Sequence, residues 1–128
     1  MAENGVFHWN ELMTSDTEGA KAYYGATVGW RFEAMPMDQG GTYWICMAGD
    51  KPCGGIMPLD GVAAEGTPPH WFTYLAVDDL EARLEKAKCL GGTVLREPFE
   101  VPGIGKIAMV QDPQGAPMGW ITPAEKSG

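Results

Sequence analysis

Two stretches of this chain, 63 residues apart, carry the same pattern of strand and helix residues. Residues 7–16 and residues 70–79 each read as a strand that runs directly into a helix start. Four pairs of landmarks keep the spacing: Trp9 with Phe72, Leu12 with Leu75, Asp16 with Asp79, and Gly29 with Gly92. Stacked arrays need three or more repeats to bury their faces, so two copies are expected to cover each other.

Capping signals mark the start of a helix in each copy. Ser15 stands three residues before Glu18, and Asp78 stands three residues before Glu81. In this arrangement the first side chain accepts a hydrogen bond from a backbone N–H of the first helical turn. The carboxylate three residues later accepts a hydrogen bond from the backbone N–H of the capping residue. We therefore predict that Ser15 and Asp78 are the N-cap residues.

Each predicted helix is followed by three strand-like segments. The helices are expected over residues 16–27 and 79–90, ended by Gly29 and by Gly91 and Gly92, because a left-handed C-terminal turn favours glycine. Strands are predicted over residues 31–37, 42–48, 52–58, 93–101, 105–111 and 117–122. The result is a βαβββ order, twice. We expect one domain over residues 1–128, made of a module at 5–59 and a module at 70–124, joined by the linker 60–69.

Composition narrows the class of protein. The chain has 128 residues, of which 45% are apolar, enough for one core, and no segment approaches the length of a membrane span. A formal charge of −8 disfavours nucleic acid and anionic membranes as partners. Three cysteines without CxxC spacing, and an N-terminus without a secretory signal pattern, predict a cytoplasmic protein with reduced thiols.

Three segments together resemble the vicinal oxygen chelate superfamily, and more narrowly its glyoxalase/bleomycin-resistance-like proteins. They are the strand-to-helix entry at residues 9–16, the helix exit from Ala22-Tyr23-Tyr24 to Val28-Gly29-Trp30, and the Asp112-Pro113-Gln114-Gly115-Ala116 turn before the last strand. The resemblance covers about residues 6–123. It implies an α+β fold in which curled sheets form a cup, with the helices on the convex side and the site inside.

The resemblance also implies where a metal ion would bind in the metalloenzymes of this family. The ligand positions map onto Trp9, Phe72 and Gly119, with a fourth near Gly54 or Gly55. None of these side chains is a metal donor, since a metal needs imidazole, carboxylate or thiolate groups. We therefore predict no metal and no cofactor. His8 and His70 are the remaining candidates for a metal or catalytic role, against an ordinary place at the rim or in packing.

Strand alternation predicts which side chains line the cup. Side chains two apart share a face, which groups Trp9, Glu11 and Met13 on the first strand and Phe72, Tyr74 and Ala76 on the fifth. Trp44 or Tyr43, Ile56 or Met57, and Ile121 are expected to extend this lining. Aromatic walls with few polar groups are typical of a small-molecule pocket, although the same rings could simply fill a collapsed interior.

Glu11 is the predicted functional residue. A carboxylate between Trp9 and Met13 on an apolar face is costly unless it is paired, and such groups in clefts often transfer protons. Three roles remain open: an acid/base, an anchor for a cationic ligand, or a structural partner of Tyr74.

The sequence thus predicts a metal-independent handler of a small organic molecule, with two functions left open. The first is a glyoxalase-related lyase or isomerase with catalytic Glu11 and a binding surface of Trp9, Met13, Phe72, Tyr74 and Ile121. The alternative is a binding or sequestration protein of the bleomycin-resistance type, without turnover. A homodimer is expected in either case.

Overall fold

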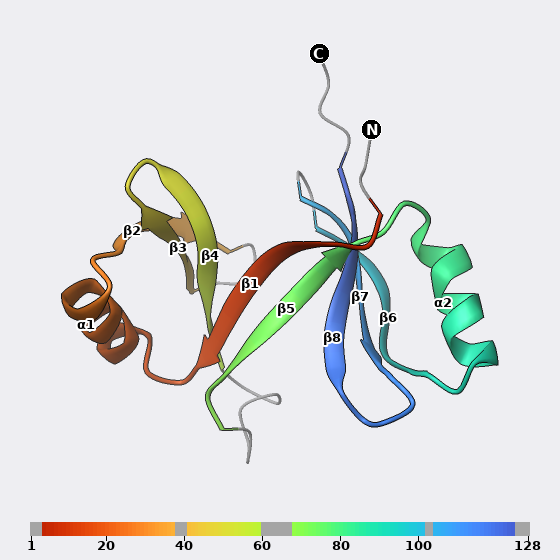
Figure 1. Cartoon of the computed structure of the whole chain (residues 1–128). Helices are drawn as coiled ribbons and strands as arrows, with labels where there is room; N and C mark the ends of the chain where they lie inside the picture. Colours follow the sequence, from red (N-terminus) through yellow and green to blue (C-terminus); the bar gives the residue numbers. More distant parts are fainter. Residues whose placement is uncertain (1–3, 38–40, 60–67, 102–103, 125–128) are drawn as a thin grey trace. The chain divides into compact units, whose positions relative to one another are not determined.

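The computed structural model describes residues 4–37, 41–59, 68–101 and 104–124. Eight strands and two helices follow one another in these residues (Figure 1). In chain order they are β1 (Val6–Thr14), α1 (Thr17–Thr27), β2 (Arg31–Pro36), β3 (Thr42–Ala48), β4 (Lys51–Pro58), β5 (His70–Ala76), α2 (Leu80–Cys89), β6 (Thr93–Val101), β7 (Gly105–Gln111) and β8 (Pro117–Pro123). The predicted α+β class and the repeated βαβββ order are confirmed.

The chain folds as two compact units, and each is described by itself. One unit comprises residues 9–72, and the other comprises residues 1–8 together with 73–128. A backbone hydrogen bond connects the N-terminal residues to the rest of the second unit: Gly5 N–H donates to the Ala76 carbonyl at 2.7 Å. The division into modules at 5–59 and 70–124 stays a prediction, and most of the predicted linker, residues 60–67, lies outside the described residues.

In the unit of residues 9–72, the strand order is β2-β3-β4-β1. β1 runs parallel to β4, with Glu11 opposite Gly55 and Leu12 opposite Ile56. Leu12 and Ile56 join Cys46 in a buried cluster, against which Tyr24 of α1 packs. Because side chains alternate along a strand, Glu11 is directed to the opposite face from Leu12 and from the helix.

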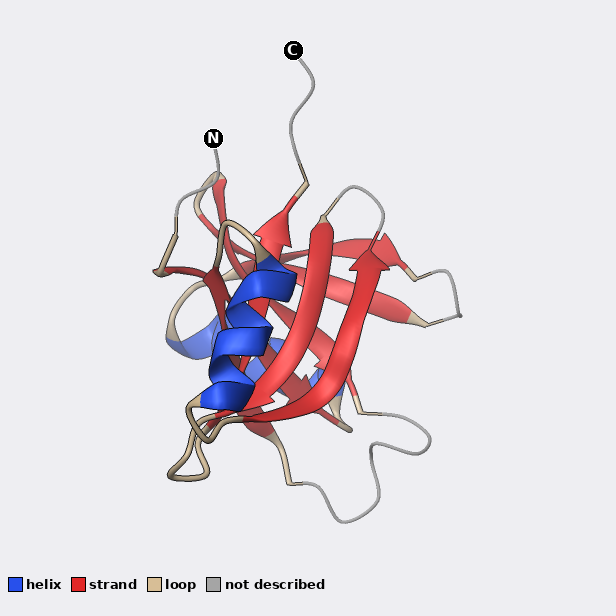
Figure 2. Cartoon of the chain, turned by 90° about the vertical axis from the view of Figure 1, so that its right-hand side faces the viewer, coloured by secondary structure: helices blue, strands red, loops and turns tan. Residues whose placement is uncertain are grey.

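In the other unit, the strand order is β5-β8-β7-β6. β5 runs parallel to β8, with Tyr74 opposite Gly119, so the pairing of the first unit is repeated. Leu80 and Leu84 of α2 are buried against Ala108 and Val110 of β7. α2 is the helix nearest the viewer in Figure 2, where it lies along the strands of its own unit.

Both helices begin one residue later than the sequence indicates. Asp16 and Asp79 are the N-caps, and their carboxylates accept hydrogen bonds from Gly19 N–H at 2.9 Å and Ala82 N–H at 3.2 Å. The prediction of Ser15 and Asp78 as N-caps is therefore wrong. At each helix start two residues that could cap are adjacent in the sequence. In both cases the second of them accepts the hydrogen bond from the third helical N–H.

The helix ends agree with the prediction. Gly29 and Gly91 have φ of +80° and +96°, a left-handed conformation that glycine adopts without strain. Gly92 N–H then donates to the Ala87 carbonyl at 2.8 Å, which satisfies one of the last carbonyls of α2.

Candidate functional site

Trp9, Glu11 and Met13 share the face of β1 that points away from the Leu12 cluster. Glu11 is only 9% exposed, which is unusual for a carboxylate. A buried carboxylate needs hydrogen-bond partners, because removing its charge from water carries a large penalty. The side chains around Glu11 therefore decide what it can do.

Tyr43 of β3 joins Trp9 to Glu11. The indole Nε1–H of Trp9 donates to the Tyr43 hydroxyl oxygen at 2.8 Å, and Tyr43 is also hydrogen-bonded to the Glu11 side chain. An indole nitrogen can only donate, and a phenol has a single proton, so the Tyr43 proton is directed at the carboxylate. The three residues form one directed chain of hydrogen bonds that ends on Glu11.

The surroundings keep Tyr43 protonated. Burial of the phenol, followed by the negative charge of Glu11, raises the pKa of Tyr43 far above its ordinary value of 10.0. The bond from Trp9 acts in the opposite direction but is a smaller effect. Tyr43 is therefore a hydrogen-bond donor, and uncharged, at neutral pH.

A glycine makes room for this arrangement. Gly55 lies opposite Glu11 on β4, and a Cβ atom at Gly55 would collide with the hydroxyl and ring of Tyr43. The Tyr43 hydroxyl can occupy this place only because residue 55 has no side chain. We call Trp9, Glu11, Met13, Tyr43 and Gly55 the Glu11 site.

The sequence did not identify two members of this site. From the sequence, Tyr43 is only an alternative to Trp44, and Gly55 is only a possible ligand position. Trp44 in fact packs against the Leu12 cluster, with the Lys21 ammonium 3.2 Å from its ring centroid. The signal for Gly55 was its place in a strand, since glycine there often marks close approach of another group.

The remaining predicted site residues lie on β5 and β8. In the second unit the Tyr74 ring lies over Gly119, where a Cβ would overlap the ring, and Ile121 is buried opposite Ala76. Phe72, assigned to the first unit, is buried, and its ring centroid is 6.3 Å from that of His70. Each unit thus has a ring seated over a strand glycine, Tyr43 over Gly55 and Tyr74 over Gly119.

The residues at the family's metal positions do not fit a divalent ion. Trp9, Phe72 and Gly119 bring no donor side chain, and the described residues contain no group of three His, Cys, Asp or Glu side chains that could hold a metal. His8 is exposed, and His70 Nδ1 lies 2.9 Å from the Pro68 carbonyl oxygen.

Comparisons of the sequence connect the chain to one family and to longer relatives. The family described as the Glyoxalase/Bleomycin resistance protein/Dioxygenase superfamily matches residues 6–118. "Putative glyoxylase CFP32" of Mycobacterium bovis is 41% identical over 124 residues, which are 95% of this chain and 46% of the relative. "Anthracycline biosynthesis protein DnrV" of Streptomyces peucetius is 36% identical over 115 residues, which are 88% of this chain and 39% of the relative. The chain spans about half the length of these curated relatives, or less.

Solved structures show the same fold at low sequence identity. Methylmalonyl-CoA epimerase from Mycobacterium tuberculosis superposes with a TM-score of 0.70 at 18% identity, over 98% of this chain and 93% of the epimerase. At this identity the likeness concerns the fold alone. None of the helices in the described ranges is both long and apolar enough to cross a membrane.

Proposed function

Because the chain belongs to the glyoxalase/bleomycin resistance protein/dioxygenase superfamily, we propose that it handles a small organic molecule at the Glu11 site without a metal ion. The favoured function is that of a lyase or isomerase in which Glu11 is the acid/base. The observation that carries this proposal is the buried Glu11 carboxylate, which receives the directed hydrogen bond of Tyr43 on an otherwise apolar strand face.

The chemistry follows from the carboxylate. Glu11 takes a proton from a C–H next to the carbonyl group of an unsaturated substrate, and the electron pair moves into the carbonyl to form a conjugated enolate. Glu11 then returns the proton to a different carbon of this enolate, the carbonyl re-forms, and the double bond has moved. Trp9 and Met13 supply the apolar contacts that bind the body of such a molecule.

Tyr43 is the positioning residue in this scheme. Its proton holds the Glu11 carboxylate in one orientation, and the bond from Trp9 fixes the phenol in turn. Since Tyr43 stays protonated at neutral pH, it does not compete with Glu11 for the substrate proton.

A binding protein without turnover is the second candidate function. The same carboxylate among apolar side chains suits a ligand with an aromatic body and a cationic group, because Glu11 would pair with the cation and Trp9 would contact the ring. A formal charge of −8 also favours cationic ligands over anionic ones. One relative is named for anthracycline biosynthesis, and that name does not specify a catalytic step.

We also propose a cytoplasmic homodimer. Cys46, Cys53 and Cys89 are all free thiols, as expected in a reducing compartment.

Deuterium exchange tests the proposed chemistry without a known substrate. The protein is incubated with a metabolite extract and a chelator in deuterated buffer, and the metabolites are examined by mass spectrometry. Wild-type protein is expected to label at least one metabolite, and Glu11→Gln should label it roughly 10²–10⁴ times more slowly while still retaining it on ultrafiltration.

The matched control is Tyr23→Phe, which removes the same hydroxyl from an exposed tyrosine and should leave labelling unchanged. A metabolite that wild type retains but never labels, and that Glu11→Gln no longer retains, would support the binding protein instead. If Glu11→Gln matched wild type in both measurements, Glu11 would be a structural residue and the proposed site would be wrong.

A further inference from the structure

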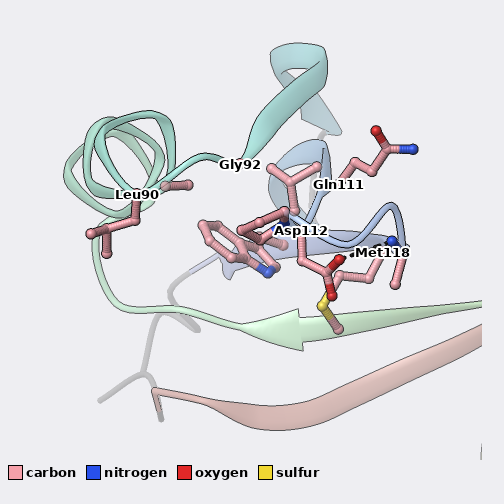
Figure 3. Close-up of a pocket in the computed structure, with 10 residues that line it drawn as sticks. Leu90, Gly92, Gln111, Asp112 and Met118 are labelled. Atoms are coloured by element: carbon pink, nitrogen blue, oxygen red, sulfur yellow. Dashed lines mark hydrogen bonds between the residues drawn. The ribbon is translucent and has the colours of Figure 1, made fainter.

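The second unit contains a pocket that the Glu11 site does not use. It lies between the C-terminal end of α2 and the turn that joins β7 to β8 (Figure 3). In Figure 3, Leu90 approaches it from the end of α2, and Asp112 and Met118 approach it from the β7–β8 turn and β8. Its volume is about 190 Å³.

The walls of this pocket are apolar. Leu90, Val110, Pro113, Met118 and Trp120 are the large apolar side chains of its lining. The one carboxylate in the lining, Asp112, is occupied by its own turn, because its Oδ1 accepts hydrogen bonds from the backbone N–H groups of Gln114 and Ala116.

Two buried polar groups on the same sheet face lack partners among the described residues. They are the indole Nε1–H of Trp120 and the hydroxyl of Thr73. Leu75 lies opposite Trp120 on the neighbouring strand, and Thr73, two residues before Leu75, points to the same face. A buried donor without an acceptor destabilises the structure that contains it, so an acceptor brought by a guest would be favourable.

From these observations we propose that this pocket binds a compact, uncharged molecule with an apolar ring and one carbonyl oxygen. The apolar walls take the ring, and the Trp120 N–H donates to the oxygen. The molecule must be small, since ligand pockets for drug-sized compounds are roughly 300–1,000 Å³ and this pocket is smaller. A charged group is disfavoured, because the apolar walls would remove it from water.

Binding requires a small movement of the wall. Trp120 Nε1 is covered in the free structure, so a guest reaches it only when a neighbouring side chain shifts. Met118 lines the pocket two residues before Trp120, and the flexible thioether side chain of methionine can adopt another rotamer readily.

Two probes of similar shape test this proposal. Cyclohexanone has the ring and the carbonyl oxygen, whereas methylenecyclohexane has the ring with a CH₂ group in place of the oxygen. Titration of each probe is followed by the indole N–H resonance of Trp120 in ¹⁵N-labelled protein, assigned by its absence from Trp120→Phe. Wild type should bind cyclohexanone roughly five- to tenfold more tightly, with a shift of that resonance.

The variants separate the hydrogen bond from the apolar contacts. Trp120→Phe should bind both probes equally, whereas the control Trp30→Phe, in the other unit, should keep the preference for the ketone. Should Trp120→Phe fail to fold, Leu90→Ala at the exposed rim is the second variant, and it should weaken both probes. The proposal is overturned if neither probe moves the Trp120 resonance up to its solubility, or if wild type binds the two probes equally. It is also overturned if cyclohexanone binds but leaves the Trp120 N–H resonance unchanged, because the ketone oxygen would then not accept that hydrogen bond.

Discussion

At the scale of single residues, burial and the neighbouring Glu11 charge raise the pKa of Tyr43 far above its ordinary value. Tyr43 accepts a hydrogen bond from Trp9, donates one to Glu11, and occupies the space that Gly55 leaves open. The bond to Glu11 requires a neutral phenol, whereas the bond from Trp9 would persist with a phenolate. The protonation of Tyr43 should therefore be linked to the stability of the fold.

The sign of this linkage is fixed by the direction of the pKa shift. The pKa of Tyr43 is raised in the folded state, so its contribution to stability is fully present below the unfolded value of about 10 and is lost as the pH rises above it. The free energy of unfolding should fall by up to about 1.4 kcal/mol per pH unit above pH 10 from this group. Urea unfolding at pH 8 to 11 measures the slope.

Tyr43→Phe should reduce this alkaline slope and lower the stability at pH 8 by about 1–3 kcal/mol, because Trp9 and Glu11 each lose a buried partner. Burial also raises the pKa of the Cys46 thiol to about 12, and that group contributes to the slope in both proteins. The difference between variant and wild type isolates Tyr43. An unchanged slope in Tyr43→Phe would contradict the linkage.

At the scale of elements, the two helix starts offer a direct test of which residue caps. Asp16→Ala should destabilise the protein by about 1 kcal/mol, because the Gly19 N–H loses its acceptor. Ser15→Ala is the matched control and should change stability by only a few tenths of that amount. Thermal melts of both variants measure the two losses of stability. A larger loss of stability in Ser15→Ala than in Asp16→Ala would show that Ser15 is the N-cap.

The elements were predictable from the sequence because their signals are local. Gly29 and Gly91 end the helices, and the alternation along residues 6–14 places Glu11 and Leu12 on opposite faces of β1. The choice between Tyr43 and Trp44 was not predictable. The face of β3 depends on its pairing with β4, and the register of that pair shifts between Cys46 and Met47.

At the scale of the whole molecule, the residues at the metal-ligand positions of the family's metalloenzymes do not fit a metal ion. Trp9, Phe72 and Gly119 occupy ligand positions without donor side chains. We therefore expect purified protein to contain no stoichiometric divalent ion and to melt at the same temperature with or without a chelator. Elemental analysis that finds about one Zn, Ni, Fe or Mn per chain would show that other residues supply the ligands.

The two modules should depend on each other for folding. The buried cluster of the first unit contains only Leu12, Cys46 and Ile56 among the described residues, and a domain of about 60 residues is marginal in any case. The first residues of β1 also belong to the second unit, where Gly5 is bonded to Ala76. We expect a fragment of residues 1–62 to lack a cooperative thermal transition in circular dichroism, whereas the full chain melts cooperatively under the same conditions. A monomeric fragment with a cooperative melt would instead mean that the first module folds on its own.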